Sequence, residues 1–279
     1  MPPDPGLAAA LVAGAFGLVF GSFLNVCIHR WPRDLSVVRP RSMCPHCERP
    51  IVWYDNIPLA SYVILRGRCR YCREPISWRY PAVEALTAGA FFYFVWHYGG
   101  LSPVALKHCV FSAILIALVF ADIETLLLPD ELTVGGLCAG LAIAWFVPVP
   151  DSIVALVAHN ANRRLVSVAE ALLGAAVPSL ALWFVGWLFE KLRHKEGLGF
   201  GDVKMIAMIG AFLGLRGALL SIAVGAVVGS IAGIIWIAVR RKDAATYPLP
   251  FGAFLGLAAF IAAMDGQRLI AWYAGLLGL

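Results

Sequence analysis

Long apolar segments follow one another along most of this sequence, and they restrict the chain to a fold built in lipid. A helix needs about 20 apolar residues to cross the hydrocarbon core, where its backbone polar groups must be satisfied internally. Hydrophobic residues make up 61% of the chain and charged residues 14%, outside the usual range of soluble domains. We expect helices at roughly 7–28, 82–99, 104–121, 132–149, 168–189, 203–215, 217–239 and 251–264. The sequence thus predicts an all-α polytopic membrane protein with about eight transmembrane helices.

The distribution of basic residues predicts how these helices are oriented. Ten of the 22 lysines and arginines lie in residues 29–81. Such an excess is typical of loops on the cytoplasmic side of a membrane. We therefore expect the N-terminus outside, residues 1–28 as a retained first transmembrane helix, and residues 29–81 in the cytoplasm. The net charge of +5 is an orientation signal on this interpretation, so lipid is an expected partner and nucleic acid is not.

Residues 29–81 form the one predicted domain outside the membrane, and they carry two cysteine pairs. Cys44 and Cys47 are followed by Cys69 and Cys72, in a C-x2-C-x21-C-x2-C arrangement. Each pair can direct two thiolates at one ion, and two pairs complete a tetrahedral Zn²⁺ site. Disulfides are the alternative, but they need an oxidising compartment. We expect a cytoplasmic four-cysteine zinc-binding domain, in which structural zinc supplies folding energy that so small a core lacks.

Two acidic residues stand beside apolar segments, where a charge is costly. Asp122 directly follows the apolar run 110–121, and Asp202 directly precedes the apolar run 203–215. Acids at such positions usually face a polar cavity and serve a function. The predicted topology puts both on the cytoplasmic side, so they can share one cavity. For Asp130, which precedes the next apolar run, a stabilising interaction with that helix dipole is the simpler interpretation.

Asp122 and Asp202 are our candidates for a catalytic pair. Two carboxyl groups close together in a medium of low dielectric constant share one proton. The ionised group can then deprotonate a water molecule while the protonated group polarises a peptide carbonyl. This is aspartyl protease chemistry, and it suits a sequence that has no Gly-x-Ser-x-Gly or His-Glu-x-x-His motif.

The residues that lead to Asp202 are rich in glycine. Gly197, Gly199 and Gly201 remove side chains from this stretch, which permits close approach of an extended substrate. A flexible connection between helices is the alternative explanation. Lys204 either raises the positive potential near the carboxyl pair or extends its ammonium group to the membrane interface. We therefore take Gly199, Gly201 and Lys204 as candidates that support the substrate or its loop.

Several further segments carry a recognisable pattern. They are residues 21–26 (GSFLNV), the two cysteine pairs, residues 55–58 (DNIP) with Ser61, and residues 76–84 (ISWRYPAVE). Together with residues 122–133 and 199–204 (GFGDVK), they resemble the bacterial prepilin peptidases, also called type IV leader peptidases. The last segment resembles the Gly-x-Gly-Asp signature shared with presenilin-like intramembrane proteases. The resemblance covers the chain from about residue 21 to residue 260.

This resemblance implies an activity and a location. Family members are aspartic endopeptidases that cleave the leader from type IV prepilins and type II secretion pseudopilins at the cytoplasmic face of the bacterial inner membrane. By position, Asp122 and Asp202 would be the catalytic pair, within a transmembrane aspartyl protease domain of residues 82–279. The resemblance also implies N-methylation of the new N-terminus with S-adenosylmethionine, for which the sequence indicates no binding residues. The family tends to have proline in place of Ala253, a departure from which we expect little effect on the chemistry.

Two other functions are compatible with this composition. A proton-coupled transporter also places acids in the membrane, but it predicts two similar halves, and the sequence has no such internal repeat. A non-catalytic zinc-knuckle membrane scaffold would need neither aspartate. The sequence predicts neither the oligomeric state nor the particular pilin that is processed.

Overall fold

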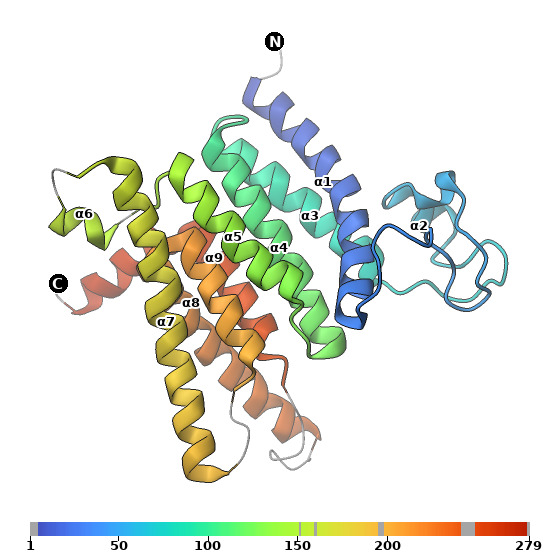
Figure 1. Ribbon diagram of the computed structural model, residues 1–279. Helices are drawn as coiled ribbons and strands as arrows, with labels where there is room; N and C mark the ends of the chain where they lie inside the picture. Colours follow the sequence, from blue (N-terminus) through green and yellow to red (C-terminus); the bar gives the residue numbers. More distant parts are fainter. Residues whose placement is uncertain (1–4, 151, 159–160, 195–197, 241–248, 278–279) are drawn as a thin grey trace. The chain divides into compact units, whose positions relative to one another are not determined.

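The computed structural model describes residues 5–150, 152–158, 161–194, 198–240 and 249–277 (Figure 1). Within these ranges the regular secondary structure is helical, and two isolated β-bridges are the only strand-like pairings. Five helices are long and apolar enough to cross a membrane, at Gly6–Arg33, Pro103–Thr125, Arg163–Arg193, Phe200–Trp236 and Phe251–Tyr273. These findings confirm the predicted all-helical, multi-pass class for the described part of the chain. The chain forms two compact units, Met1–Phe120 and Ala121–Leu279.

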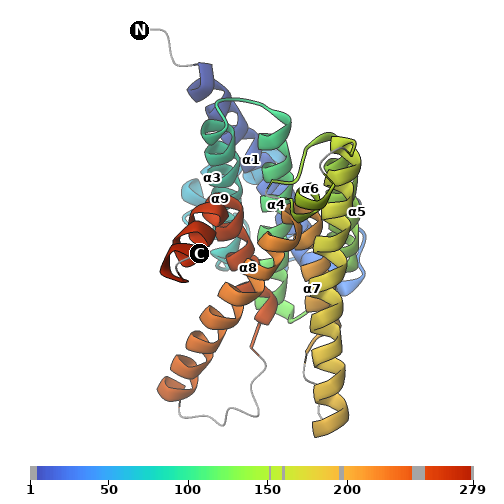
Figure 2. The same ribbon diagram turned by 90° about the vertical axis from the view of Figure 1, so that its left-hand side faces the viewer.

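The first unit is built on two helices that pack side by side, α1 (Pro5–Arg30) and α3 (Arg79–His97) (Figures 1 and 2). Their backbones approach closely at glycines of α1. A Cβ atom on Gly21 would lie 2.8 Å from the Cα atom of Glu84. In lipid no hydrophobic effect drives helices together, and small residues let the two backbones come close enough for van der Waals packing. The unit also contains the first part of α4 (Pro103–Thr125).

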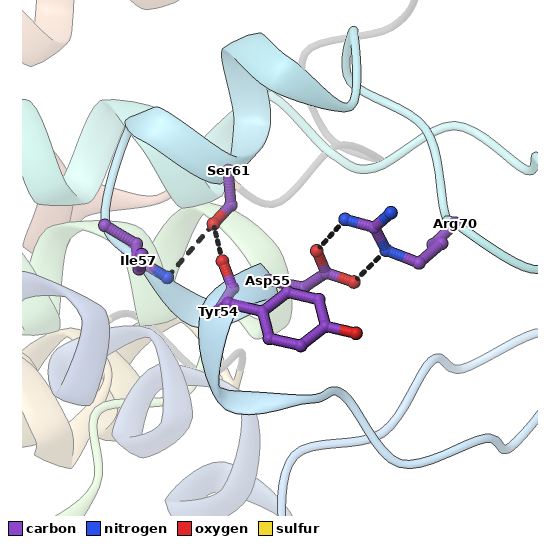
Figure 3. Close-up of polar contacts among 5 residues, drawn as sticks. All are labelled: Tyr54, Asp55, Ile57, Ser61 and Arg70. Atoms are coloured by element: carbon purple, nitrogen blue, oxygen red, sulfur yellow. Dashed lines mark hydrogen bonds and ion pairs between the residues drawn. The ribbon is translucent and has the colours of Figure 1, made fainter.

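Residues 31–78, which we call the cysteine module, connect α1 to α3. Its helical turns are η1 (Trp31–Arg33), η2 (Trp53–Asn56) and α2 (Ala60–Ile64). Ser61 joins two of these turns, since its hydroxyl accepts a hydrogen bond from the Ile57 N–H and donates one to the Tyr54 carbonyl, each 3.0 Å long (Figure 3). So few regular elements leave little apolar area to bury, which is why a module of this size usually needs a metal ion.

The second unit contains the end of α4 and five further helices. These are α5 (Asp130–Phe146), α6 (Ile153–Val157), α7 (Arg163–Arg193), α8 (Phe200–Arg240) and α9 (Phe251–Leu277). Helix α8 packs against α5, α7 and α9, so it is the central element of this unit. Its contact with α7 is a backbone contact, because a Cβ atom on Gly210 would overlap the Gly174 carbonyl.

Helix α8 is broken at Gly214, whose φ of 74° and ψ of −174° are not helical. The chain reverses direction at this break. Gly233, late in α8, lies beside Leu249, which is three residues before Gly252. Gly252 lies beside Asp122, which interacts with Asp202 at the start of α8, so the two parts of α8 run back toward the same end of the unit. The predicted separate helices at 203–215 and 217–239 therefore correspond to the two segments on either side of this break. Helix α9 is broken in the same way at Asp265, one residue after the predicted helix end at residue 264. The helical segment that follows this kink, up to Leu277, was not predicted.

The buried carboxylate of Glu170 in α7 satisfies backbone groups at the break in α8. Its side chain is 1% exposed. One oxygen accepts a hydrogen bond from the Leu215 N–H, at 3.1 Å. The other accepts hydrogen bonds from the Val154 N–H and the Ser152 hydroxyl, both also 3.1 Å long. A buried acid with this many donors stabilises an irregular backbone that lipid could not.

Candidate functional site

Asp122 lies in the last turn of α4 and is 5% exposed. Its Oδ2 atom accepts a hydrogen bond of 2.8 Å from the backbone N–H of Ala253, in the first turn of α9. The backbone N–H of Gly252 interacts with the same carboxyl group. The start of a helix presents unpaired N–H groups and the positive end of its dipole. Asp122 therefore sits where a negative charge is stabilised by the backbone.

Asp202 is the third residue of α8, and its backbone N–H donates to the Gly199 carbonyl at 3.1 Å. Its carboxyl group interacts electrostatically with that of Asp122. Eighty positions separate these residues in the sequence, and the fold of the second unit brings their side chains together. A Cβ atom on Gly199 would lie 3.3 Å from Asp202 Oδ2, so glycine leaves room beside this carboxyl group.

Leu128 fills the space between the starts of α8 and α9. A Cβ atom on Gly201 would lie 3.1 Å from Leu128 Cβ, and one on Gly252 would lie 3.1 Å from Leu128 Cδ1. The Gly252 position is also only 3.0 Å from Asp122 Oδ2. Glycine at these two positions therefore lets both helix starts pack against Leu128, and at Gly252 it also lets α9 approach the Asp122 carboxyl group. For Gly201, this packing against Leu128 is a structural reason that our sequence analysis did not include, and Gly197 lies outside the described residues.

Lys204 forms an ion pair that the sequence analysis missed. Its Nζ atom lies 2.6 Å from Oδ1 of Asp130 and 5.0 Å from the centre of the Phe200 ring. Asp130 is in the first turn of α5, as the dipole interpretation expected. The two residues are 74 positions apart, so no spacing rule could have paired them. The ion pair links α5 to α8 at a position two residues after Asp202.

Ala253 makes a tertiary contact that the sequence did not predict. We expected its departure from the family pattern to affect the chemistry little. In the structure, its backbone N–H is a direct hydrogen-bond donor to Asp122. Proline has no N–H group and could not make this bond. This contact was not foreseen because a helix start was judged only as a local feature, without its tertiary partner, and the effect of Ala253 on the chemistry stays a prediction.

The four predicted cysteine ligands come together in the first unit. The sulfur atoms of Cys44, Cys47, Cys69 and Cys72 all lie within 4.8 Å of one another, and the Cys44 and Cys72 sulfurs are 3.7 Å apart. Zn–S bonds of about 2.3 Å in a tetrahedron place the sulfurs about 3.8 Å apart. All four thiols are free, so the alternative of two disulfides is not what the structure shows.

The two cysteine pairs are held by turns of the same geometry. The N–H of Cys44 donates to the Arg49 carbonyl at 3.0 Å, and the N–H of Cys69 donates to the Glu74 carbonyl at 2.8 Å. Backbone N–H groups of Cys72 and Tyr71 lower the pKa of the Cys69 thiol to about 6. Because metal ions bind thiolates, this donor set and its geometry fit Zn²⁺.

Sequence comparisons match both parts of the chain. The bacterial peptidase A24 N-terminal domain matches residues 15–98, and the type IV leader peptidase family matches residues 109–234. The prepilin leader peptidase/N-methyltransferase of Stutzerimonas stutzeri is 36% identical over 96% of this chain and 94% of its own length. The chain belongs to the type IV leader peptidase family. The first match includes the four clustered cysteines, and the second includes both aspartates.

Other members of the type IV leader peptidase family match to a similar extent. The prepilin leader peptidase/N-methyltransferase of Xanthomonas campestris pv. campestris is 37% identical over 99% of this chain and 97% of its own. That of Aeromonas hydrophila is 36% identical over 92% and 91%. No solved structure matches the chain significantly. The similarity to these relatives therefore extends over at least 92% of the chain.

Proposed function

We propose that this protein cleaves the leader peptide from type IV prepilins and type II secretion pseudopilins, and then N-methylates the new N-terminus. Relatives that carry both activities in their names align over nearly the full chain. The observation that carries the peptidase proposal is the meeting of two carboxyl groups, from the end of α4 and the start of α8, beside the first turn of α9. A transporter or a non-catalytic scaffold is not favoured, because the relatives are named as enzymes.

In this mechanism the two aspartates have different roles. Asp122 is the ionised partner, because backbone N–H donors stabilise a carboxylate. It takes a proton from a water molecule as the water oxygen bonds to the scissile carbonyl carbon. Asp202 is the protonated partner and donates a hydrogen bond to the carbonyl oxygen, which becomes negatively charged in the transition state. The C–N bond then breaks, and the departing amine takes up the proton.

The proposed membrane topology has eight crossing segments. They are α1, α3, α4, α5, α7, the two segments of α8 and α9. With the N-terminus outside, the arginine-rich cysteine module faces the cytoplasm of a bacterial inner membrane, and so do the end of α4 and the start of α8. We assign residues 1–28 to the first transmembrane helix, 29–81 to the zinc-binding domain and 82–279 to the protease domain.

Zn²⁺ in the cysteine module has a structural role in this proposal. Four thiolates occupy every position of a tetrahedral ion, so no position is left for water or substrate. The module would then be folded by its metal, as small zinc domains are. S-adenosylmethionine is the methyl donor that the relatives' second activity implies, and we assign no residue to it.

The peptidase proposal is tested with the purified protein and a prepilin in lipid. Asp122→Asn and Asp202→Asn should each lower kcat/KM for leader release by about 10²–10⁴-fold, since each replaces one carboxyl group of the proton-sharing pair with a neutral amide of similar size that cannot share the proton. Glu131→Gln, a change to an exposed acid at the start of α5, is the matched control and should keep full activity. Zinc content and thermal stability establish that the variants are folded. Full activity in either aspartate variant contradicts the assigned pair.

Mass spectrometry of the processed pilin measures the two proposed activities together. Cleavage alone changes the mass by the leader, and methylation adds one methyl group to the new N-terminus. A processed but unmethylated product, in the presence of S-adenosylmethionine, would contradict the methyltransferase part and leave the peptidase part standing.

A further inference from the structure

The cysteine module carries a hollow that the proposed function does not use. It has a volume of about 750 Å³ and is lined by Ile64, Leu65, Arg66, Arg68, Arg70 and Arg73. We call it the arginine hollow. Four guanidinium groups around one depression create a positive potential that attracts an anionic group.

One of these four arginines is neutralised within the module. Arg70 forms a two-bond ion pair with Asp55, in which Nε lies 2.6 Å from Oδ2 (Figure 3). No acidic partner within the described residues contacts Arg66, Arg68 or Arg73, and all three are exposed. The hollow therefore keeps three uncompensated positive charges. Asp55 fixes the fourth guanidinium, so the charged wall is partly rigid.

Apolar side chains stand directly beside these charges. In α2 only Ser61 is buried, whereas Val63 and Ile64 are 72% and 74% exposed. Ile64 also lines the arginine hollow. Two large exposed aliphatic side chains next to a cationic depression form an amphipathic surface. Such a surface suits the boundary between lipid headgroups and acyl chains, where both kinds of group are satisfied.

Helix α2, which carries this amphipathic surface, lies alongside the first turns of α3 and not beyond the end of α3. The N–H of Leu59, just before α2, donates to Oε2 of Glu84 at 2.8 Å. Glu84 lies five residues inside α3, which is about 7.5 Å along the helix axis. In Figure 1 the module accordingly extends sideways from α1 and α3. If α3 crosses the bilayer, α2 lies at the depth of the headgroups.

We propose that the arginine hollow binds the phosphate groups of anionic phospholipids in the surrounding membrane, with Val63 and Ile64 inserted at the acyl boundary of the same leaflet. Guanidinium groups bind phosphate with two parallel hydrogen bonds, which lysine cannot do. An acidic protein would match the charge but would not explain the two exposed aliphatic side chains. Bound lipid would hold the cysteine module against the bilayer surface. This inference depends on the membrane position of α3 and not on the peptidase activity.

The test measures backbone hydrogen–deuterium exchange of residues 59–68 in the full-length protein. The protein is placed in nanodiscs of phosphatidylcholine alone, or of phosphatidylcholine mixed with phosphatidylglycerol. We expect slower exchange of this segment in the anionic discs, and loss of the difference in high salt. Each arginine near an anionic surface contributes about fivefold to binding. Arg66→Gln/Arg68→Gln should therefore weaken the lipid-dependent protection by about thirtyfold.

A matched control variant loses the same two positive charges at another place in the cysteine module. Arg39→Gln/Arg41→Gln changes two arginines that do not line the arginine hollow, and it should keep the protection. Zinc content of both variants verifies the fold. Equal exchange in the two lipid mixtures, or an equal effect of the control, overturns the proposal.

Two further arms identify other anionic occupants. Inorganic phosphate added to neutral discs should give no protection at millimolar concentration; if it protects as well as the anionic lipid does, the hollow is a site for free phosphate. Polyglutamate is the probe for an acidic protein. Protection by polyglutamate without protection by phosphatidylglycerol also overturns the lipid assignment. Leader cleavage is measured on the same samples, so a failure here is distinguishable from a failure of the proposed function.

Discussion

Asp122 and Asp202 are similar in the sequence and different in the structure. Each is an acid beside an apolar run, and that pattern alone gives them equivalent roles. The fold adds backbone donors from α9 to Asp122. Within the described residues, Asp202 accepts no side-chain hydrogen bond, and the nearby charge is that of Asp122. This asymmetry is the physical basis on which we propose an ionised Asp122 and a protonated Asp202.

The donor from Ala253 gives a prediction at the scale of one atom. Ala253→Pro removes the N–H group that contacts Asp122, while proline is tolerated in the first turn of a helix. A hydrogen bond to a charged group contributes about 1.5 kcal/mol or more, so we expect kcat for leader cleavage to fall about tenfold. Ala253→Gly keeps the N–H and should retain most of the activity. Equal kcat values for the two variants would mean that this bond does not support catalysis.

At the scale of the helices, the close contact between α7 and α8 depends on two glycines, Gly174 and Gly210. A Cβ atom on Gly210 would overlap the Gly174 carbonyl, whereas one on Gly135 in α5 would meet no atom within 4 Å. Gly210→Ala must therefore push α7 away from the segment that carries Asp202. Overpacking of this kind costs about 1–3 kcal/mol. We expect a lower midpoint of thermal unfolding and reduced leader cleavage, measured in lipid.

Gly135→Ala is the control for that substitution. It adds the same methyl group to a helix of the same unit, at a position with free space. Its unfolding midpoint should stay the same or rise slightly, because alanine favours helix over glycine. Should Gly210→Ala unfold at the same temperature as this control, the close packing of α7 on α8 would be contradicted.

The cysteine pairs give a prediction for the module as an element. The Cys69 thiolate is present above its pKa of about 6 and is lost as the pH falls through that value. Protons and Zn²⁺ compete for the same sulfur, so zinc should be retained at pH 7 and released in acid, below about pH 6. A colorimetric chelator follows the release. Cys69→Ser should lack zinc at pH 7, whereas Cys138→Ser, outside the cluster, should keep it.

For the whole molecule, the sequence predicted what depends on local pattern and missed what depends on tertiary proximity. Apolar runs located the helices, and the cysteine spacing located the cluster of four thiols. The Lys204–Asp130 pair joins residues 74 positions apart, and the Ala253 contact to Asp122 joins residues 131 apart. No periodicity or motif encodes such contacts. The predicted helix end at residue 264 coincides with the kink of α9 at Asp265, and only the helical segment after that kink was missed.

The orientation of the whole chain is the last prediction, and it rests on the asymmetry of its basic residues. With the N-terminus outside, α6 lies on the outer side and residues 31–78 lie inside. Val157→Cys, 84% exposed in α6, and Leu35→Cys, 51% exposed in the cysteine module, report the two sides. Exposed Cys138 is first replaced by alanine to remove its background. A maleimide that cannot cross membranes should label Val157→Cys in intact cells with a permeable outer membrane, and Leu35→Cys only after lysis. The reverse pattern would put Asp122 and Asp202 on the side away from the cytoplasm, where an unprocessed pilin leader is not presented to them.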